Sequence, residues 1–167
     1  MIFVGLGSNL PAEPHNSSKE TLIAAVDSFI DWGIDVNRIS SWYKSAPVPI
    51  SDQPWYVNAV AEVKTSLSPH DLIKTLLKIE KIFGRHRVTK NGARTLDLDL
   101  LTYYKVIIDG TVKNGITAFI PHPRMIKRKF VLMPIRELYP NWIHPYSGCG
   151  IQDLIKCLPK DQITTLL

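Results

Sequence analysis

Two aspartates separated by one residue, Asp97 and Asp99, are the side chains of this sequence best suited to chemistry. They lie in the segment 96–101, whose alternation of leucine and aspartate predicts a short strand buried on one face. Because side chains alternate along a strand, both carboxylates are expected on the same side, with Cα atoms about 6–7 Å apart. Such a pair can hold one or two Mg²⁺ ions, which prefer oxygen ligands and also bind nucleotide phosphates.

A basic segment, 84–94, lies immediately before this strand. It contains the three arginines Arg85, Arg87 and Arg94, with a lysine, a histidine and two glycines, and it has no apolar periodicity. These features predict a loop, and the arginine fork of donors suits phosphate oxygens. An isolated aspartate pair would also fit the solvated edge of a strand, and an isolated basic loop would fit an ordinary turn. Their adjacency favours phosphoryl transfer, with cations on both sides of the phosphates.

The elements that must position these residues follow from periodicity and capping signals. A first helix is expected from a cap at 16–18 to about Trp32, and a second from the Ser-Pro-His-Asp sequence at 68–71 to near Phe83. Strands are expected over 2–6, 36–44, 56–63 and 96–101, with a proline-rich loop over 45–54.

This order of elements, β-α-β-β-α-β, predicts an α+β fold with a ferredoxin-like βαββαβ core. In such a core, helices flank an antiparallel sheet, here in a three-layer α-β-α arrangement. After the aspartate strand, Val106–Ile108 is expected to form its hairpin partner, and 151–158 a short helix.

Length and composition indicate one globular domain over 1–167, because 167 residues with 45% hydrophobic side chains can build a single sizeable core. The net charge of +5 suits an acidic ligand and does not require nucleic acid. Cys149 and Cys157 form no zinc-binding pattern. We expect a cytoplasmic chain, because there is no apolar run of roughly 18 residues and no basic segment at the N-terminus. The strand that starts at residue 2 and the short tail favour a stand-alone chain.

The common phosphate-binding loops are missing from the sequence. The segment 5–10 begins like the dinucleotide-binding pattern but ends in Leu10 where that pattern has its last glycine. No Gly-x-x-x-x-Gly-Lys-Ser/Thr sequence occurs anywhere in the chain. A bound nucleotide must therefore be held by other means.

Five segments in order resemble the 6-hydroxymethyl-7,8-dihydropterin pyrophosphokinase family, and the similarity covers nearly the whole chain as far as Met133-Pro134. The most specific is Arg-Thr-Leu-Asp-Leu-Asp after a basic loop, followed by Pro-His about twenty residues later. The segments are 4–10, 41–45, 53–58, 92–99 and 121–125. The resemblance implies that ATP donates its β,γ-diphosphate to the hydroxymethyl group of the pterin, releasing AMP, as a step of folate synthesis.

The resemblance also implies roles for individual residues. Asp97 and Asp99 would bind two Mg²⁺ ions between ATP and the substrate hydroxyl. Arg85, Arg87 and Arg94 would be catalytic: Arg85 and Arg87 would close over the phosphates, and Arg94 would help to order the closed site. The residues expected to bind ATP are Arg85, Arg87, His122, Arg128 and Glu80. The residues expected to bind the pterin are Gly7, Ser45, Val48, Tyr56, Asn58 and Phe130, with Tyr56 and Phe130 on either side of the ring.

The chain departs from the family pattern in the basic loop. Asn91 stands where many members have tryptophan, which puts closure over the pterin in question. Ala46 replaces a common proline, and Pro123 replaces a tyrosine found in some members. None of these changes affects the aspartates or the arginines.

Two other classes of function fit parts of the sequence. A metal-dependent nucleotide hydrolase could use the same aspartates, and it would cleave ATP without a pterin. A ferredoxin-like nucleic-acid-binding module would need aromatic residues in an RNP pattern, which the sequence lacks. We therefore expect ATP and the pterin as partners of a monomeric chain, with no nucleic acid and no membrane.

Overall fold

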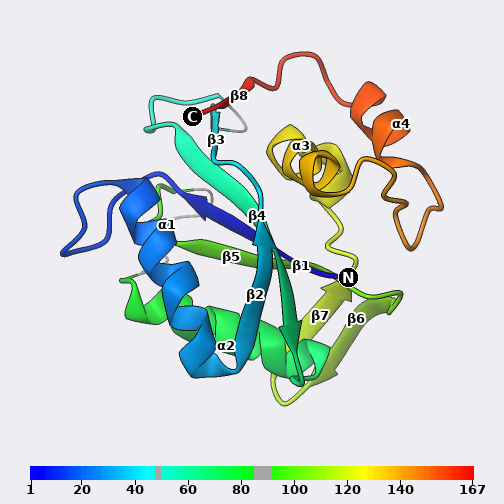
Figure 1. Ribbon diagram of the computed structural model, residues 1–167, viewed down its shortest axis with the longest axis horizontal. Coiled ribbons are helices and arrows are strands. Elements are labelled where there is room, and N and C mark those ends of the chain that lie inside the picture. The colour runs from blue at the N-terminus through cyan, green and yellow to red at the C-terminus, as the bar shows by residue number, and fades with distance from the viewer. Residues whose placement is uncertain (48–49, 85–91) are drawn as a thin grey trace.

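The computed structural model describes residues 1–47, 50–84 and 92–167 and consists of three layers (Figure 1). The middle layer is a six-stranded sheet. Helices α1 (Ser18–Asp27) and α2 (Pro69–Ile82) cover one face, and α3 (Lys129–Leu138) and α4 (Ile151–Lys156) cover the other. No helix in these ranges has the length and apolar character needed to cross a membrane.

The sheet is antiparallel, and β1 lies between the two strands that carry most of the candidate site. The strand order is β5 (Asp97–Tyr103), β1 (Ile2–Ser8), β4 (Tyr56–Thr65), β3 (Tyr43–Ser45) and β8 (Thr164–Leu166), with β2 (Ile34–Ile39) also paired to β4. The chain order β1-α1-β2-β4-α2-β5 confirms the predicted βαββαβ core and the three-layer arrangement.

Alternation along β1 divides the interior into two hydrophobic cores. Ile2, Val4 and Leu6 point into the core beneath α1 and α2, whereas Phe3 points into the core beneath α3 and α4. All four side chains are at most 3% exposed. Burying side chains of this size on both faces stabilises the sheet by about 1.5–3 kcal/mol for each of them.

The helix caps form as predicted. Ser17 accepts a hydrogen bond from the N–H of Glu20 at 3.2 Å, and Glu20 accepts one in return from the N–H of Asn16 at 2.8 Å. Ser68 caps α2, with Pro69 in its first turn. The first helix is shorter than expected, because α1 ends at Asp27 and continues to Trp32 as the 3₁₀ turn Ser28–Trp32.

The expected strand over 36–44 is two strands, β2 and β3, which pair with different parts of β4. Ser40 lies at the break, where its hydroxyl accepts a hydrogen bond from the N–H of Val60 at 3.1 Å. Its own N–H donates to the carbonyl of Val60 at 3.0 Å. The side chain thus takes over one position of the ladder, which allows the chain to change direction between the strands.

The prediction that Val106–Ile108 pairs with the aspartate strand is wrong. Strand β6 (Ile108–Lys113) pairs instead with β7 (Ile116–Ile120), in a separate two-stranded sheet. The turn between them is Asn114-Gly115, and both residues have positive φ, 52° and 75°. Asn-Gly is the preferred sequence for a two-residue hairpin turn of this kind, so local backbone preference selects this pairing.

Helix α3 is tied to the segment between β2 and β3 through Glu137. Its Oε1 accepts hydrogen bonds from the N–H and the hydroxyl of Ser41, at 2.8 and 2.9 Å. Its Oε2 accepts one from the hydroxyl of Tyr43 at 2.7 Å. Burial works to raise the pKa of Glu137, but the hydrogen bonds from Ser41 and Tyr43 outweigh it, so the pKa lies below its ordinary value.

This lowered pKa predicts a pH-dependent stability. Because the pKa of Glu137 is lower in the folded chain, its contribution is complete above the ordinary value of 4.5 and is lost as pH falls through the folded value. We expect the melting temperature of Glu137→Gln to lie below that of the wild type at about pH 7, with a difference that shrinks towards about pH 3. Circular dichroism melts across this range measure it. A difference that does not change with pH would contradict the assignment.

Candidate active site

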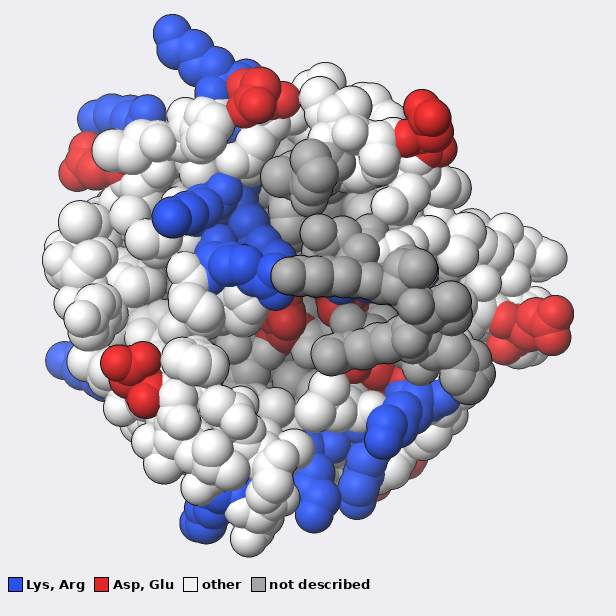
Figure 2. Space-filling view, turned by 180° about the vertical axis from the view of Figure 1, so that it is seen from behind, with Lys and Arg blue, Asp and Glu red and all other residues white. Residues whose placement is uncertain are grey.

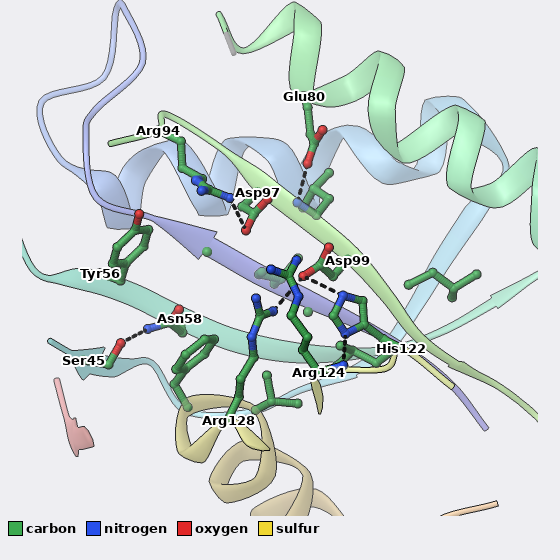
Figure 3. Close-up of a pocket in the computed structure, with 18 of the residues that line it drawn as sticks. Ser45, Tyr56, Asn58, Glu80, Arg94, Asp97, Asp99, His122, Arg124 and Arg128 are labelled. Atoms are coloured by element: carbon green, nitrogen blue, oxygen red, sulfur yellow. Dashed lines mark hydrogen bonds and ion pairs between the residues drawn. The ribbon is translucent and has the colours of Figure 1, made fainter. Parts of the chain in front are cut away.

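A cavity of about 1000 Å³ opens on the face of the sheet next to α3 and contains the predicted site residues that the structure describes. These lining residues are Gly7, Ser45, Tyr56, Asn58, Glu80, Arg94, Asp97, Asp99, His122, Arg128 and Phe130. They come from β1, β3, β4, α2, the segment before β5, β5 itself, the segment that leads into α3, and the first turn of α3 (Figure 3). The predicted residues Val48, Arg85 and Arg87 lie outside the described ranges.

The two aspartates lie on the cavity side of β5, as their spacing predicts. Leu98 between them is 5% exposed and points into the opposite core. On the neighbouring strand, Gly5 is the pairing partner of Asp99 and Gly7 that of Asp97. Because these glycines have no side chains, the backbone of β1 forms an open floor beside the carboxylates.

Each carboxylate has a guanidinium beside it. Nη1 of Arg94 donates to Oδ2 of Asp97 at 3.0 Å, and Nη1 of Arg128 donates to Oδ2 of Asp99 at 3.1 Å. Arg94 lies in the segment just before β5, and Arg128 lies at the start of α3, so the two arginines reach β5 from segments far apart in the sequence. Charge-assisted bonds of this kind hold the guanidinium groups beside the carboxylates, where they can also donate to phosphate oxygens.

His122 presents a hydrogen-bond donor to the carboxylate of Asp99. Its Nδ1 accepts from the N–H of Arg124 at 3.2 Å, which assigns the ring proton of the neutral form to Nε2. Nε2 lies 3.7 Å from Oδ2 of Asp99. Burial lowers the pKa of His122, and nearby Arg128 and Arg124 add to this, while Asp99 opposes it. The imidazole is therefore neutral at pH 7 and faces the carboxylate with an N–H group.

The other end of the cavity carries the uncharged polar side chains Ser45, Asn58 and Tyr56. Asn58 is 4% exposed, and its Nδ2 donates to Oγ of Ser45 at 2.9 Å. In the ladder of β3 and β4, Ser45 pairs with Tyr56, so all three side chains lie on one face of the sheet. Figure 3 shows this group at one side of the pocket, His122 at the other, and the two aspartates between them.

The described contact of Glu80 supports the strand. This residue of α2 is 2% exposed, and its Oε1 accepts from the N–H of Leu98 at 2.7 Å, between the two aspartates. Its position four residues after Leu76, on the buried stripe of α2, is the signal that could have indicated a buried carboxylate. The hydrogen bond anchors β5 at the centre of the site.

Asn9 is a site-supporting residue that the sequence analysis did not identify. It is 3% exposed, and its Oδ1 accepts from the N–H of Arg94 at 2.7 Å. Its Nδ2 donates to the carbonyl of Pro54 at 3.1 Å and to Oε1 of Gln53 at 3.3 Å. One amide therefore joins the segment before β5 to the loop before β4. An asparagine just after a predicted strand suggests only a turn, so its partners could not be inferred.

Two basic side chains beyond those expected also line the cavity. Arg124 and Lys127, which the sequence analysis did not assign, line it together with Arg94 and Arg128. Seen from behind, lysine and arginine side chains gather around a hollow in which acidic side chains are visible (Figure 2). This distribution favours a ligand with several negative charges.

The anchoring role of Glu80 can be tested by its stability effect. Replacing Glu80 by alanine leaves the buried N–H of Leu98 without this acceptor, which costs about 1–3 kcal/mol. Glu80→Gln retains a carbonyl oxygen that can accept the same bond, so we expect a smaller loss. Urea unfolding of the two variants and the wild type measures the difference. Equal stability of all three chains would contradict the role.

Comparison with known proteins identifies the family. Residues 3–140 match the family model described as 7,8-dihydro-6-hydroxymethylpterin-pyrophosphokinase (HPPK). A 2-amino-4-hydroxy-6-hydroxymethyldihydropteridine pyrophosphokinase of Synechocystis sp. is 42% identical over 153 residues, covering 92% of this chain and 73% of that protein. The protein of the same name from Haemophilus influenzae is 40% identical over 155 residues, covering 92% and 90%.

A solved structure supports the fold. Wild-type HPPK-DHPS of Plasmodium falciparum with SDX-DHP superimposes with a TM-score of 0.68 and 14% sequence identity, over 93% of this chain. The chain spans 43% of that longer protein. With the family model matching more than three quarters of the sequence, the resemblance inferred from the five segments is confirmed. The chain belongs to the 7,8-dihydro-6-hydroxymethylpterin-pyrophosphokinase family.

Proposed function

We propose that this chain acts as a single domain that transfers the β,γ-diphosphate of ATP to 6-hydroxymethyl-7,8-dihydropterin, giving the pterin diphosphate and AMP in folate synthesis. The proposal rests on the combination of side chains that line one cavity. Asp97 and Asp99 lie at its middle beside guanidinium groups, and the uncharged Asn58 and Tyr56 lie at one end. A polyphosphate and a planar heterocycle need such neighbouring environments.

We propose that Asp97 and Asp99 hold the two Mg²⁺ ions of the reaction. Among residues 1–47, 50–84 and 92–167, no group of three or more His, Cys, Asp or Glu side chains could form a metal site by itself. Two carboxylates suit Mg²⁺ nevertheless, because this ion commonly takes one or two protein carboxylates and completes its shell with water and substrate phosphates. When bound, Mg²⁺ would neutralise phosphate charge and align the reacting oxygens.

The basic residues would hold the triphosphate. Arg94 and Arg128 are bonded to the aspartates, so they lie where the reacting phosphates would bind. His122 would donate its Nε2–H to a phosphate oxygen. Arg85 and Arg87 remain candidates for the same task. This machinery fits phosphoryl transfer, in which positioning and charge stabilisation supply most of the catalysis.

The pterin would occupy the uncharged end. Tyr56 and Phe130 both line the cavity and would pack on a flat bicyclic ring, and the Arg128 guanidinium lies 5.5 Å from the centroid of the Phe130 ring. Asn58 offers an amide to the ring's donor and acceptor edge, and Ser45 holds that amide in place at 2.9 Å. Gly7 leaves the floor beneath the ring open. Val48 remains a further candidate for this end.

The reaction products test the proposal directly. With ATP, Mg²⁺ and 6-hydroxymethyl-7,8-dihydropterin, we expect AMP and pterin diphosphate in equal amounts, and no AMP without the pterin or with EDTA. Asp97→Asn and Asp99→Asn should each lower kcat by about 10²–10³, because each removes charge that organises the transition state. Chromatography of the nucleotides measures both. Asp153→Asn, in the exposed pair with Lys156, is the matched control for the loss of a carboxylate.

Other outcomes would assign the cavity to the alternative functions. AMP or ADP released without the pterin would indicate a nucleotide hydrolase that uses the same aspartates. Binding of nucleic acid that needs no Mg²⁺ and weakens steeply with salt would indicate the third class.

The pterin end has its own test in Gly7→Ala. The added Cβ would lie 3.4 Å from Oδ1 of Asn58 and 3.8 Å from Cβ of Asp97, which is ordinary contact, so the chain should fold. The methyl group would occupy the floor beside Asn58, and we expect the KM for the pterin to rise about tenfold. Gly5→Ala, whose Cβ meets Leu101 at 3.4 Å, is the control and should change this KM less. Equal effects of both substitutions would contradict the placement.

A further inference from the structure

Phe130 and Glu137 lie on the same side of α3. They are seven residues apart, which is two helical turns, so their side chains project in nearly the same direction. Phe130 lines the cavity. Glu137 makes three hydrogen bonds to Ser41 and Tyr43, all from its single carboxylate. One face of α3 therefore contacts the cavity at its first turn and the β2–β3 segment at its last.

The residue held by Glu137 belongs to the ladder that carries the uncharged end of the cavity. Tyr43 pairs with Asn58, and Ser45 pairs with Tyr56. Tyr43 and Ser45 are separated by one residue, so they lie on the same face of β3, and they are 6% and 2% exposed. Tyr43 is thus the direct neighbour of Asn58 across the ladder.

The contact between Glu137 and Tyr43 is a hydrogen bond of 2.7 Å to a carboxylate, and it joins α3 to β3. Burial and the neighbouring Glu137 carboxylate raise the pKa of Tyr43 to about 12, so its hydroxyl keeps its proton and donates it across the working pH range. Hydrogen bonds to an ionised carboxylate are roughly twice as strong as neutral ones. The charged end of the cavity has different supports, since Glu80 anchors β5 and Asn9 holds the backbone of Arg94.

We propose that Glu137 is a positioning residue for the pterin end of the site, where it sets the spacing between Phe130 on α3 and the Ser45–Asn58 pair on β3 and β4. It acts through Tyr43 and Ser41 and touches no substrate. The inference rests on the proposed function, because the pterin is the ligand whose affinity this spacing would determine.

Ligand affinities of Glu137→Gln and Tyr43→Phe test the proposal. Fluorescence titration gives the Kd for 6-hydroxymethylpterin in the presence of Mg²⁺ and a non-hydrolysable ATP analogue, and calorimetry gives the Kd for the analogue alone. In Glu137→Gln we expect the pterin Kd and the KM for the pterin to rise about tenfold, because three bonds to a carboxylate are weakened. Tyr43→Phe, which removes one bond, should raise both about threefold. The analogue Kd and kcat at saturating pterin should stay within about twofold.

Controls separate positioning from general destabilisation. Asp153→Asn removes a carboxylate from the exposed pair with Lys156 on α4 and should leave both Kd values unchanged. Melting temperatures establish that each variant is folded at the assay temperature, and Tyr43→Phe keeps the test available if Glu137→Gln does not fold.

Two results would overturn the inference. One is an unchanged pterin Kd in folded variants, and the other is an equal loss of affinity for the pterin and the ATP analogue, which would indicate a purely structural role. If the wild-type chain itself fails to bind the pterin or to form AMP, the proposed function fails instead. The wild-type measurement therefore distinguishes the two failures.

Discussion

Two like charges on one face of one strand are the constraint on which the site depends. Asp97 and Asp99 project from β5 into the same cavity, and their repulsion in a partly buried place must be offset by cations. Arg94 and Arg128 supply them at 3.0 and 3.1 Å. The ion pairs bring the start of α3 and the segment before β5 to the strand, so the cavity and its charge balance arise from the same contacts.

The sheet provides the room for this arrangement through one strand. On its α1–α2 face, β1 carries large apolar side chains, whereas on the cavity side Gly5 and Gly7 follow Phe3. Phe3 closes the core beneath α3, and the two glycines open the floor next to Asp99 and Asp97. On one face of the sheet, β1 thus contributes Phe3 to the hydrophobic core beneath α3, and Gly5 and Gly7 to the floor of the cavity.

Three polar side chains hold the segments around the site in place, and of these Glu80 and Asn9 are buried whereas Glu137 is exposed. Glu80 bonds to the backbone of Leu98, and Asn9 bonds to the backbone of Arg94 and to the loop before β4. Glu137 bonds to Ser41 and Tyr43 beyond the other end of the cavity. Each joins segments far apart in the sequence, so the cavity keeps its shape through side chains whose function cannot be deduced from their residue type.

Local patterns in the sequence determined much of this protein. The alternation of Leu and Asp over 96–101 placed both carboxylates on one side of a strand, and Ser17 and Ser68 marked the helix starts, because pleat and capping act within a few residues. The Asn114-Gly115 turn is an equally local signal. It selects the pairing of β6 with β7, whereas we expected Val106–Ile108 to pair with the aspartate strand.

Only the tertiary structure decided which distant groups meet. Arg128 and His122, which follow Asp99 by 29 and 23 residues, both lie beside its carboxylate. Glu80 of α2 accepts a hydrogen bond from the backbone of β5. Packing of α2 and α3 against opposite faces of the sheet selects these partners, because burial makes each polar group find one. Local propensity does not encode these long-range contacts, which is why the sequence indicated the family and the candidate site residues but not the partners of Glu80, Asn9 and Glu137.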